Sequence, residues 1–279
     1  TVSQSGDENT ADILQSAADN TASVSQSGDE NRANVSQTAV DNVATVEQNG
    51  TENRATVTQQ GTGSSNEAVV RQGTGGGNAD QNTAIITQSK AGNQALIEQG
   101  TGSTAKENKA GIIQTNNDNT ATIRQGIGGT ARDNEATATQ SGQDNRATIN
   151  QGLLGDANDN TASVTQSGND NTATVLQNGN DNEAIVEQTT DHHTASITQT
   201  GDDATARITQ GGNEAYVTQV GHNNRRADVT QDGDDNVAYI TQLSSRNEAS
   251  ISQSGDGNLG MVWQSGGDGN EASINQVGN

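Results

Sequence analysis

Residues 169–188, NDNTATVLQNGNDNEAIVEQ, contain nearly the same pattern twice. Each copy holds an Asn, an Ala, a Val and a Gln spaced by two; the first is Asn171, Ala173, Val175 and Gln177, and the second, eleven residues later, is Asn182, Ala184, Val186 and Gln188. Residues spaced by two lie on one face of a β-strand. The stretch therefore predicts two short strands, each with a small apolar pair between two amide residues.

The same unit, Asn-x-Ala-x-Ψ-x-Gln with Val or Ile at Ψ, recurs along the chain. We count 24 units, the first cut to Val2-Ser3-Gln4, with Gln at positions 4, 15, 26, 37, 48, 59, 72, 88, 99, 114, 125, 140, 151, 166, 177, 188, 199, 210, 219, 231, 242, 253, 264 and 276. The Gln never fails, and the exceptions at the other positions are Gly260 for Ala, Ala138 for Ψ, and His193, Ala204 and Arg225 for Asn. Such regularity predicts a repeat architecture.

The composition alone would favour disorder. Hydrophobic residues make up 27% of the 279 residues and aromatic residues 1%, Phe, Pro and Cys are absent, and the net charge is −22. The periodicity argues against disorder. Without Cys there is no disulfide or thiolate metal site. No apolar run reaches the 18 residues of a membrane-spanning helix, and the acidic balance argues against nucleic acid as a partner.

The segments between units predict turns and reveal how the strands are arranged. Gly, Asp and Asn dominate these segments, as in SGND and NGND. Longer connections, each opening with Gly, follow Gln72, Gln99, Gln125 and Gln151, and two strands separate one from the next. A coil of two strands would place these four loops on the same edge. The remaining insertion, residues 60–65, would lie on the opposite edge.

The sequence therefore predicts an all-β fold: a two-sheet parallel β-solenoid of cross-β type with two strands per coil and about 12 coils. Residues 1–279 would form one continuous array of 11-residue strand–turn units, paired as repeats of about 22 residues. A right-handed coiled coil also has an eleven-residue period, but spacing by two excludes it. Thin layers of Ala and Val or Ile would fill the space between the sheets.

In such a stack, identical residues lie over one another. An inward amide can then donate to its twin on one side and accept from its twin on the other, which satisfies a buried polar group. Without that ladder the burial would cost roughly 1–3 kcal/mol per group. We predict ladder rungs at Asn171, Gln177, Asn182 and Gln188.

Each coil needs neighbours on both sides, so the terminal coils are expected to be the reactive ones. We find no capping segment at either end, and the strand order would let a second copy continue the stack. The N-terminal polymerisation edge is predicted at Val2, Gln4, Asn9, Ala11, Ile13 and Gln15. The C-terminal polymerisation edge is predicted at Asn258, Val262, Gln264, Asn270, Ala272, Ile274 and Gln276.

The pattern Gln-x-Gly-x-x-Asn-x-Ala-x-x-x-Gln at residues 4–15 and 26–37 resembles the repeat of curlin, the major subunit of bacterial curli. The resemblance implies a secreted functional amyloid that forms cell-surface fibres of the biofilm matrix and mediates adhesion and aggregation. It also implies a homopolymer, nucleation by a minor curlin-like subunit and export through an outer-membrane pore. No membrane insertion is expected.

The sequence predicts no enzyme, cofactor or metal site. Its three histidines, His192, His193 and His222, are interpreted as loop or ladder residues. Acidic turns such as residues 233–236 lack the spacing of an EF-hand loop, so only weak Ca²⁺ binding is expected there. Trp263, Tyr216 and Tyr239 are too few for a carbohydrate-binding strip.

Two alternatives are a monomeric adhesive solenoid and an ice-binding solenoid. The ice-binding alternative is motivated by the outward pairs Thr120 and Thr122, and Thr172 and Thr174. Charged residues are expected to interrupt the corresponding column; these are Arg32, Arg54, Lys109, Glu135 and Glu183.

Overall fold

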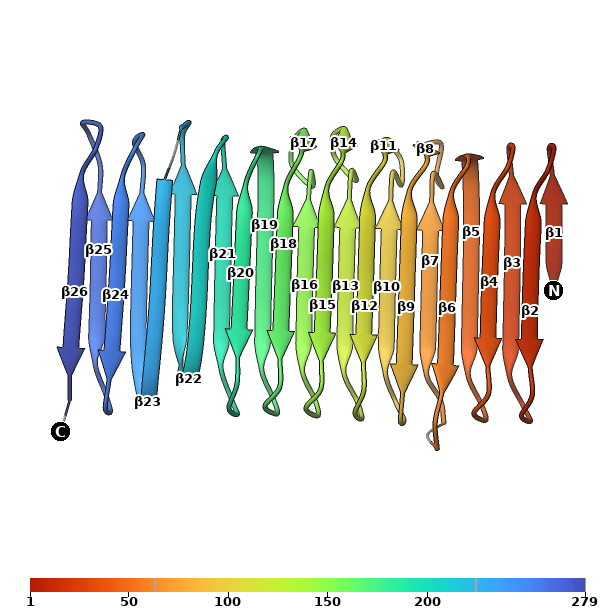
Figure 1. The fold of residues 1–279 in the computed structure, drawn as a ribbon, viewed down its shortest axis with the longest axis horizontal. Coiled ribbons are helices and arrows are strands. Elements are labelled where there is room, and N and C mark those ends of the chain that lie inside the picture. Colours follow the sequence, from red (N-terminus) through yellow and green to blue (C-terminus); the bar gives the residue numbers. More distant parts are fainter. Residues whose placement is uncertain (63, 224, 279) are drawn as a thin grey trace.

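The computed structural model describes residues 1–62, 64–223 and 225–278, and it shows a long stack of β-strands (Figure 1). Successive long strands run in opposite directions, and strands that run the same way pair in parallel from one coil to the next. The stack thus consists of two facing parallel sheets, which we call sheet I and sheet II. Two strands, one from each sheet, make one coil of the solenoid.

Sheet I contains the first strand of the chain. Its strands are β1 (Val2–Ser5), β3 (Thr21–Ser27), β5 (Val43–Thr51), β7 (Glu67–Gln72), β10 (Gln94–Gln99), β13 (Thr120–Gln125), β16 (Arg146–Gln151), β19 (Thr172–Asn180), β21 (Thr194–Thr200) and β25 (Leu259–Gln264).

Sheet II contains the second strand. Its strands are β2 (Thr10–Gln15), β4 (Arg32–Gln37), β6 (Arg54–Gln60), β9 (Thr83–Ser89), β12 (Lys109–Gln114), β15 (Glu135–Gln140), β18 (Thr161–Gln166), β20 (Glu183–Gln188), β24 (Glu248–Ser254) and β26 (Glu271–Val277). Two long strands, β22 (Ala204–Val220) and β23 (Arg225–Gln242), begin in sheet II and end in sheet I.

Pairing keeps each position of the unit over the same position of the next coil. In β16 and β19, for example, Ala147 lies over Ala173 and Gln151 over Gln177. The same register holds where a long connection intervenes, as between β10 and β13. The prediction of an all-β, two-sheet parallel solenoid of about 12 coils is confirmed.

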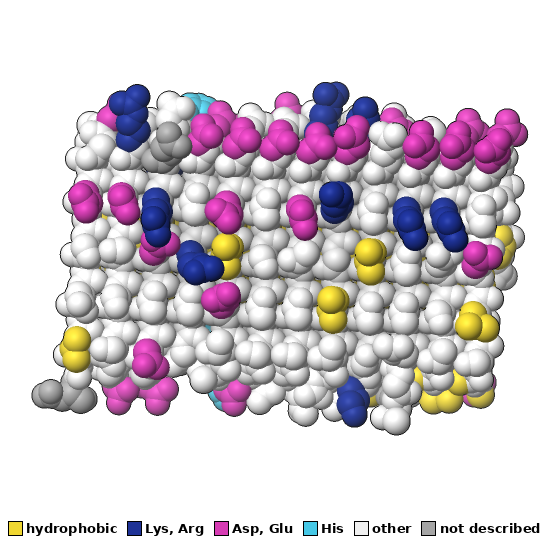
Figure 2. All heavy atoms as spheres, in the orientation of Figure 1, with side chains coloured by type: hydrophobic (Ala, Val, Ile, Leu, Met, Phe, Trp, Pro, Cys, Tyr) yellow, Lys and Arg dark blue, Asp and Glu magenta, His cyan; other side chains and the backbone are white. Residues whose placement is uncertain are grey.

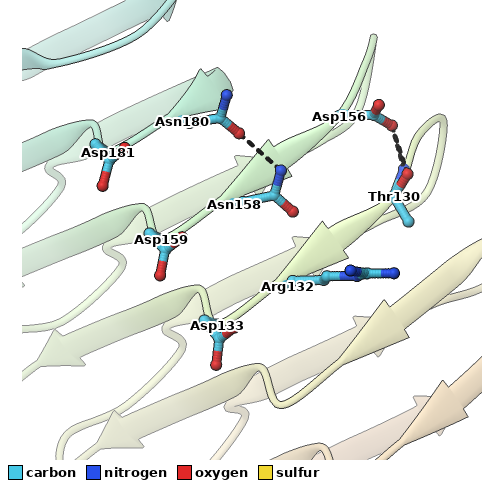
Figure 3. A pocket seen from close by; sticks show the side chains of 8 residues that line it. All are labelled: Thr130, Arg132, Asp133, Asp156, Asn158, Asp159, Asn180 and Asp181. Atoms are coloured by element: carbon cyan, nitrogen blue, oxygen red, sulfur yellow. Dashed lines mark hydrogen bonds between the residues drawn. The ribbon is translucent and has the colours of Figure 1, made fainter.

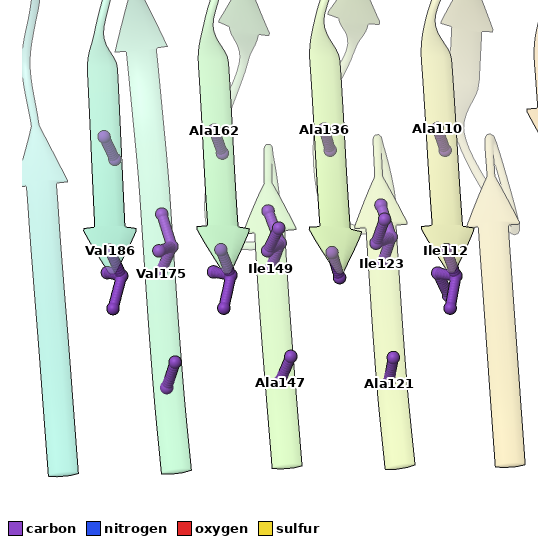
Figure 4. Close-up of a cluster of buried hydrophobic side chains, with 14 of the residues drawn as sticks. Ala110, Ile112, Ala121, Ile123, Ala136, Ala147, Ile149, Ala162, Val175 and Val186 are labelled. Carbon is purple, nitrogen blue, oxygen red and sulfur yellow. The ribbon is translucent and has the colours of Figure 1, made fainter. Parts of the chain in front are cut away.

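A thin apolar core separates the two sheets. Small Ala side chains and Val or Ile side chains from β13, β16 and β19 face those from β12, β15, β18 and β20 (Figure 4). Ile123, Ile149 and Val175 are fully buried. Burying one such side chain contributes about 1.5–3 kcal/mol. Because each coil supplies only a few of them, the core depends on contacts between coils.

The four long connections lie on one edge, as predicted (Figure 1). Their interpretation as plain loops was wrong, because each contains a short strand: β8 (Asn78–Asp80), β11 (Thr104–Lys106), β14 (Ala131–Arg132) and β17 (Ala157–Asn158). These strands pair in parallel and form a small third sheet, the edge sheet, which joins the end of β5 to the end of β19. The insertion at residues 60–65 includes residue 63, which lies outside the described residues.

Two backbone positions define the regular turn. The residue before the Asn position is left-handed in most turns, as at Asp170 (φ 56°) and Asp181 (φ 55°). Asp tolerates this conformation better than most residues. The Gly two residues after Gln is different: Gly179 has φ 107°, and a Cβ there would lie 2.2 Å from the carbonyl oxygen of Gly201 in the next coil. Close stacking of successive turns therefore requires Gly.

Residues 189–223 and 225–232 depart from this regularity, and we call them the fault zone. Only two residues separate Gln210 from Asn213, where regular units have four between Gln and Asn. β22 continues from one sheet into the other, as β23 also does across a connection of normal length, and the pairing of β22 with β23 shifts register between Gly211 and Asn213. All three exceptions at the Asn position, His193, Ala204 and Arg225, fall in this zone.

Candidate functional site: amide ladders and terminal coils

The Gln side chains form one hydrogen-bonded ladder in each sheet. In sheet I, Gln151 Nε2 donates to Gln177 Oε1, and Gln177 Nε2 donates to Gln199 Oε1, both at 2.9 Å. The same bond joins every consecutive pair along both sheets, 22 bonds of 2.7–3.1 Å. Each Gln amide donates towards the C-terminal end of the stack. The ladders therefore have a direction.

Gln side chains also tie the two sheets together. Gln177 Nε2 lies 3.1 Å from the carbonyl oxygens of Thr161 and Asn182, which belong to the facing sheet. In sheet II, Gln188 Nε2 reaches Gln210 Oε1 and the carbonyl oxygen of Thr172, both at 3.1 Å. Both Gln side chains are fully buried. Each Gln amide thus bonds both to the next coil of its own sheet and to the backbone of the facing sheet.

The Asn side chains bond both to one another and to backbone. In eleven consecutive Asn pairs the Nδ2 of the later Asn donates to the Oδ1 of the earlier one at 2.8–3.3 Å, a direction opposite to that of the Gln ladders. At other positions the side chain bonds to backbone alone. Asn171 Oδ1 accepts the backbone N–H of His193 at 2.8 Å, and Asn171 Nδ2 donates to the carbonyl oxygen of Thr190 at 2.9 Å. Asn182 Oδ1 accepts the N–H of Ala204 at 3.1 Å, and its Nδ2 donates to the carbonyl oxygen of Gly201 at 2.8 Å. At Asn171 and Asn182, therefore, the rung joins a side chain to the main chain of the next coil.

One edge of the solenoid carries a row of carboxylates. Asp133, Asp159 and Asp181 occupy the same turn position in successive coils and border an open hollow of about 660 Å³ (Figure 3). Burial and the charges of Glu107 and Asp159 raise the pKa of Asp133. The row thus repels itself. Among the described residues, no group of three or more His, Cys, Asp or Glu side chains is placed to hold a metal ion.

His193 takes over the Asn role at the start of the fault zone. Its ring is buried, its Nδ1 accepts the backbone N–H of Asn213, and its Nε2 lies 2.6 Å from Thr190 Oγ1. Burial lowers the pKa of His193. A neutral ring with an unprotonated Nδ1 fits this position, because a protonated Nδ1 would face another donor.

Arg225 is the largest fully buried side chain among the described residues. None of its three guanidinium nitrogens has a hydrogen-bond partner within the described chain. Burial lowers the pKa of Arg225, and the charges of Asp202 and Asp203 act in the opposite direction. An unpaired buried charge is costly. The sequence showed Arg at an inward position, but nothing in the repeat pattern indicated how it would be accommodated.

The first coil presents unused acceptors at its outer side. Gln4 Nε2 donates to Gln26 and Gln15 Nε2 donates to Gln37, both at 2.7 Å, while no described residue donates to Gln4 Oε1 or Gln15 Oε1. The other predicted residues of this edge, Val2, Asn9, Ala11 and Ile13, are exposed or half-buried on β1, β2 and the turn between them.

The last coil presents the complementary groups. Gln264 Nε2 and Gln276 Nε2 have no Gln beyond them among the described residues and donate to nearby carbonyl oxygens instead. Val262 and Gln264 are buried, whereas Asn258, Asn270, Ala272, Ile274 and Gln276 are half-buried. The seven residues predicted for the C-terminal edge therefore lie together on β25, β26 and their turns.

The charged residues expected to interrupt the column of outward Thr pairs lie on the other sheet, so that prediction was wrong. Arg32, Arg54, Lys109, Glu135 and Glu183 are outward residues of sheet II, whose outer face carries mixed charges in Figure 2. The Thr pairs belong to sheet I. In that sheet Thr120 and Thr172 are separated by Arg146, and Thr122 and Thr174 by Thr148. Between these two pairs the one charged residue is Arg146, and further along the same column of sheet I lie Glu67 and Glu214.

The other histidines lie at the surface. His222 Nδ1 is 2.9 Å from Asp202 Oδ2, and His192 Nε2 is 3.6 Å from Asp170 Oδ2. The described part of the chain also contains no helix of the length and apolarity needed to cross a membrane.

Together, the in-register coils and directional amide ladders define a structural repeat protein of the parallel β-solenoid class. Comparison with protein families then identifies the family to which the chain belongs. The curlin associated repeat matches residues 1–28, 28–61, 131–168, 157–189, 168–201, 180–212 and 244–278. These matches cover more than half of the chain, which therefore belongs to the curlin repeat family, a family of extracellular structural proteins. No curated protein matches the chain closely enough to count as a relative.

Proposed function

We propose that this chain is the self-assembling subunit of an extracellular, curlin-like amyloid fibre. In this proposal the last coil of one copy is continued by the first coil of the next, head to tail. The fibres would lie at the cell surface in the biofilm matrix and mediate adhesion and aggregation. The observation that carries the proposal is the single direction of the Gln ladders.

Ladder direction makes the two ends chemically complementary. Gln264 Nε2 and Gln276 Nε2 are donors at one end, and Gln4 Oε1 and Gln15 Oε1 are acceptors at the other. A head-to-tail contact would add one rung to each ladder. A head-to-head contact would place acceptor against acceptor. The ends therefore favour a polar fibre built from heterologous contacts.

Sheet order supports the same contact. The last coil consists of β25 in sheet I and β26 in sheet II, and the first coil consists of β1 in sheet I and β2 in sheet II. Stacking copies end to end would place Val262 beside Val2 and Ile274 beside Ile13. Val2 is 51% exposed, so the contact would bury apolar surface as well as edge backbone groups.

The family assignment supports an extracellular location for the proposed fibre. By resemblance to curlin, a minor curlin-like subunit would nucleate growth and an outer-membrane pore would export the chain. The proposed role requires no catalysis and no cofactor.

The proposal is tested by changing one inward residue of the last coil. Ile274→Asp places a charge among the apolar groups that the next copy would cover, and we expect elongation from preformed seeds to slow at least tenfold. The matched control is Ser273→Asp, which adds the same charge on the outer side of the same strand. Elongation is followed by thioflavin fluorescence and by electron microscopy.

Three results would count against the proposal. The wild-type chain could remain monomeric under conditions in which seeds are supplied. Its assemblies could lack the ~4.8 Å meridional reflection of cross-β structure. Finally, the two Asp variants could elongate at equal rates, which would exclude growth through the inward side of β26.

A further inference from the structure

The chain's few aromatic residues are gathered on one surface. It has one Trp, two Tyr, one Met and no Phe, and the Trp, both Tyr and the Met lie on the outer face of sheet I in its last coils. Tyr216, Tyr239 and Met261 form one column, and Trp263 and Leu259 flank it on β25. We call these five residues the aromatic patch.

Most of the patch is open to solvent. Trp263 is 68% exposed, Met261 66%, Leu259 58% and Tyr239 37%. The rings of Tyr216 and Tyr239 stack with centroids 5.0 Å apart and planes within 9°. Exposed apolar patches mark interaction sites, and aromatic residues and Met are enriched in protein interfaces. Sheet II differs, because its exposed apolar side chains are scattered singly over the face (Figure 2).

Charge is divided unevenly between faces and edges. The outer face of sheet I carries four acidic and three basic side chains, and the outer face of sheet II carries seven acidic and five basic side chains. The connections between strands hold the other 24 of the 35 acidic residues. Figure 2 shows this division, with an acidic row along the edge and mixed charges over the face. Edges of two copies therefore repel each other, and the flat faces are nearly neutral.

On sheet I the charges are also paired with one another. Glu47, Arg71, Glu98 and Arg124 alternate in one column. Arg71 Nε lies 3.3 Å from Glu47 Oε2, and Arg124 Nε lies 2.9 Å from Glu98 Oε2. This face therefore offers a chain of net charge −22 the least repulsive approach to another copy.

We propose that the aromatic patch is a lateral docking surface for a second copy of this chain, with patch packed on patch across a twofold axis. An isologous contact needs a self-complementary surface, and an apolar patch of uncharged side chains meets that need. The contact uses outward side chains, so it is separate from the proposed end-to-end growth, which uses the inward and edge groups of the terminal coils.

Cysteine cross-linking tests the contact, because the natural chain has no Cys. Thr241→Cys places a thiol beside the patch on the sheet I half of β23. The matched control, Thr230→Cys, places one at the equivalent outward position of the sheet II half of the same strand. With a short thiol-reactive cross-linker, we expect covalent dimers from Thr241→Cys at about ten times the yield from Thr230→Cys. Equal yields, or no dimer from Thr241→Cys, would overturn the proposal.

Trp263 supplies a second measurement without a cross-linker. Its emission should move to shorter wavelength as protein concentration rises. The shift should vanish in the variant Tyr216→Thr/Tyr239→Thr/Met261→Thr, which leaves the inward ladders intact, and persist in the sheet II control Ile85→Thr/Ile185→Thr. An emission that responds to a soluble β-glucan oligosaccharide but not to protein concentration would instead assign the patch to carbohydrate. Fibres that grow singly, with no lateral pairs, would refute this contact but not the proposed end-to-end growth.

Discussion

Residues 119–188, the regular stretch, and the fault zone that follows them show which parts of the repeat are indispensable. In the regular stretch every unit has its Asn, its inward apolar pair and its Gln. The fault zone loses the Asn three times and shortens one turn to two residues, yet its Gln column continues through Gln188, Gln210 and Gln231 without a missing bond. The Gln ladder and the core therefore maintain the stack, and the Asn position and the length of the turn are adjustable.

The fault zone also shows how the chain compensates for a lost Asn. Where Ala204 supplies no side-chain oxygen, the backbone N–H of Arg225 bonds to the carbonyl oxygen of Asp203 at 3.3 Å. Where His193 replaces Asn, its Nδ1 accepts in place of Oδ1. These substitute hydrogen bonds differ in length and acceptor from one position to the next, whereas the Asn bonds of the regular stretch are alike. The backbone of the fault zone is therefore expected to unfold locally before that of the regular stretch.

The largest effect is expected at a turn Gly of the regular stretch. Gly179→Ala puts a Cβ 2.2 Å from the carbonyl oxygen of Gly201 at a φ of 107°, whereas the nearest atom to a Cβ at Gly211 in the fault zone is 3.6 Å away. We expect Gly179→Ala to lower the local free energy of opening by about 4 kcal/mol, and Gly211→Ala by less than about 1 kcal/mol. Hydrogen exchange of the flanking amides measures the free energy of opening in both variants. An equal decrease in the two would contradict the need for close stacking of the turns.

The next effect compares the two amide columns. Gln177→Ala leaves Gln151 Nε2 and Gln199 Oε1 without their partner in a buried position, so we expect a loss of about 3 kcal/mol. Asn182→Ala reproduces the situation that Ala204 already has in the fault zone and should cost about 1 kcal/mol. Hydrogen exchange at increasing denaturant concentration measures the free energy of opening of both variants. A costlier Asn182→Ala would reverse our ranking of the columns.

A substitution in the fault zone is expected to stabilise the chain. Arg225→Asn removes a buried guanidinium that has no hydrogen-bond partner among the described residues, and it restores the Asn of the repeat. We expect the local free energy of opening to rise by about 2 kcal/mol. Arg207→Asn, an exposed change on the outer face of sheet II, is the control and should have little effect. A loss of protection in Arg225→Asn would mean that the buried guanidinium stabilises this zone.

The smallest effect is a pH dependence at His193. Burial lowers its pKa in the folded chain, so below the usual His pKa of 6.5 the unfolded chain binds a proton that the folded chain does not. Stability should therefore fall as the pH drops below about 6.5. The charged groups around the ring are Asp191, His192 and Asp234, and the two Asp favour the protonated form.

His193→Asn should remove this pH dependence. The quantity to measure is the difference in melting temperature between wild type and His193→Asn from pH 7.5 to pH 5, because groups common to both chains, such as Asp133 with its raised pKa, cancel in the difference. A difference that does not change with pH would show that His193 keeps the same protonation state in both forms of the chain.

Most of the fold follows from the spacing of a few residue types. Spacing by two gives strands, the fixed Gln column gives the register, and the distance between long connections gives two strands per coil. The edge sheet was missed although a signal was present: Ala79, Ala105, Ala131 and Ala157 each stand three residues before the Asn position. Such short strands are stable only because neighbouring coils pair with them, which single-segment reasoning does not reveal.

The candidate site was predictable in position but not in detail. Repetition shows that Gln177 has a twin in the neighbouring coil, but it cannot give the direction of the donor, which depends on side-chain rotamers shared by the whole column. Nor does it reveal that Asn171 bonds to backbone, because that depends on the path of the next turn. The aromatic patch was overlooked because Tyr216, Tyr239 and Trp263 are far apart in sequence and converge only through pairing of β22, β23 and β25.

In the proposed fibre, copies join head to tail by continuing the Gln ladders. Cryo-electron microscopy of assembled wild-type chain tests it most directly. We expect a polar fibre in which β25 and β26 of one copy pair in parallel with β1 and β2 of the next, with Gln264 over Gln4 and Gln276 over Gln15. Rods that end after one copy, or junctions that join like ends, would contradict it.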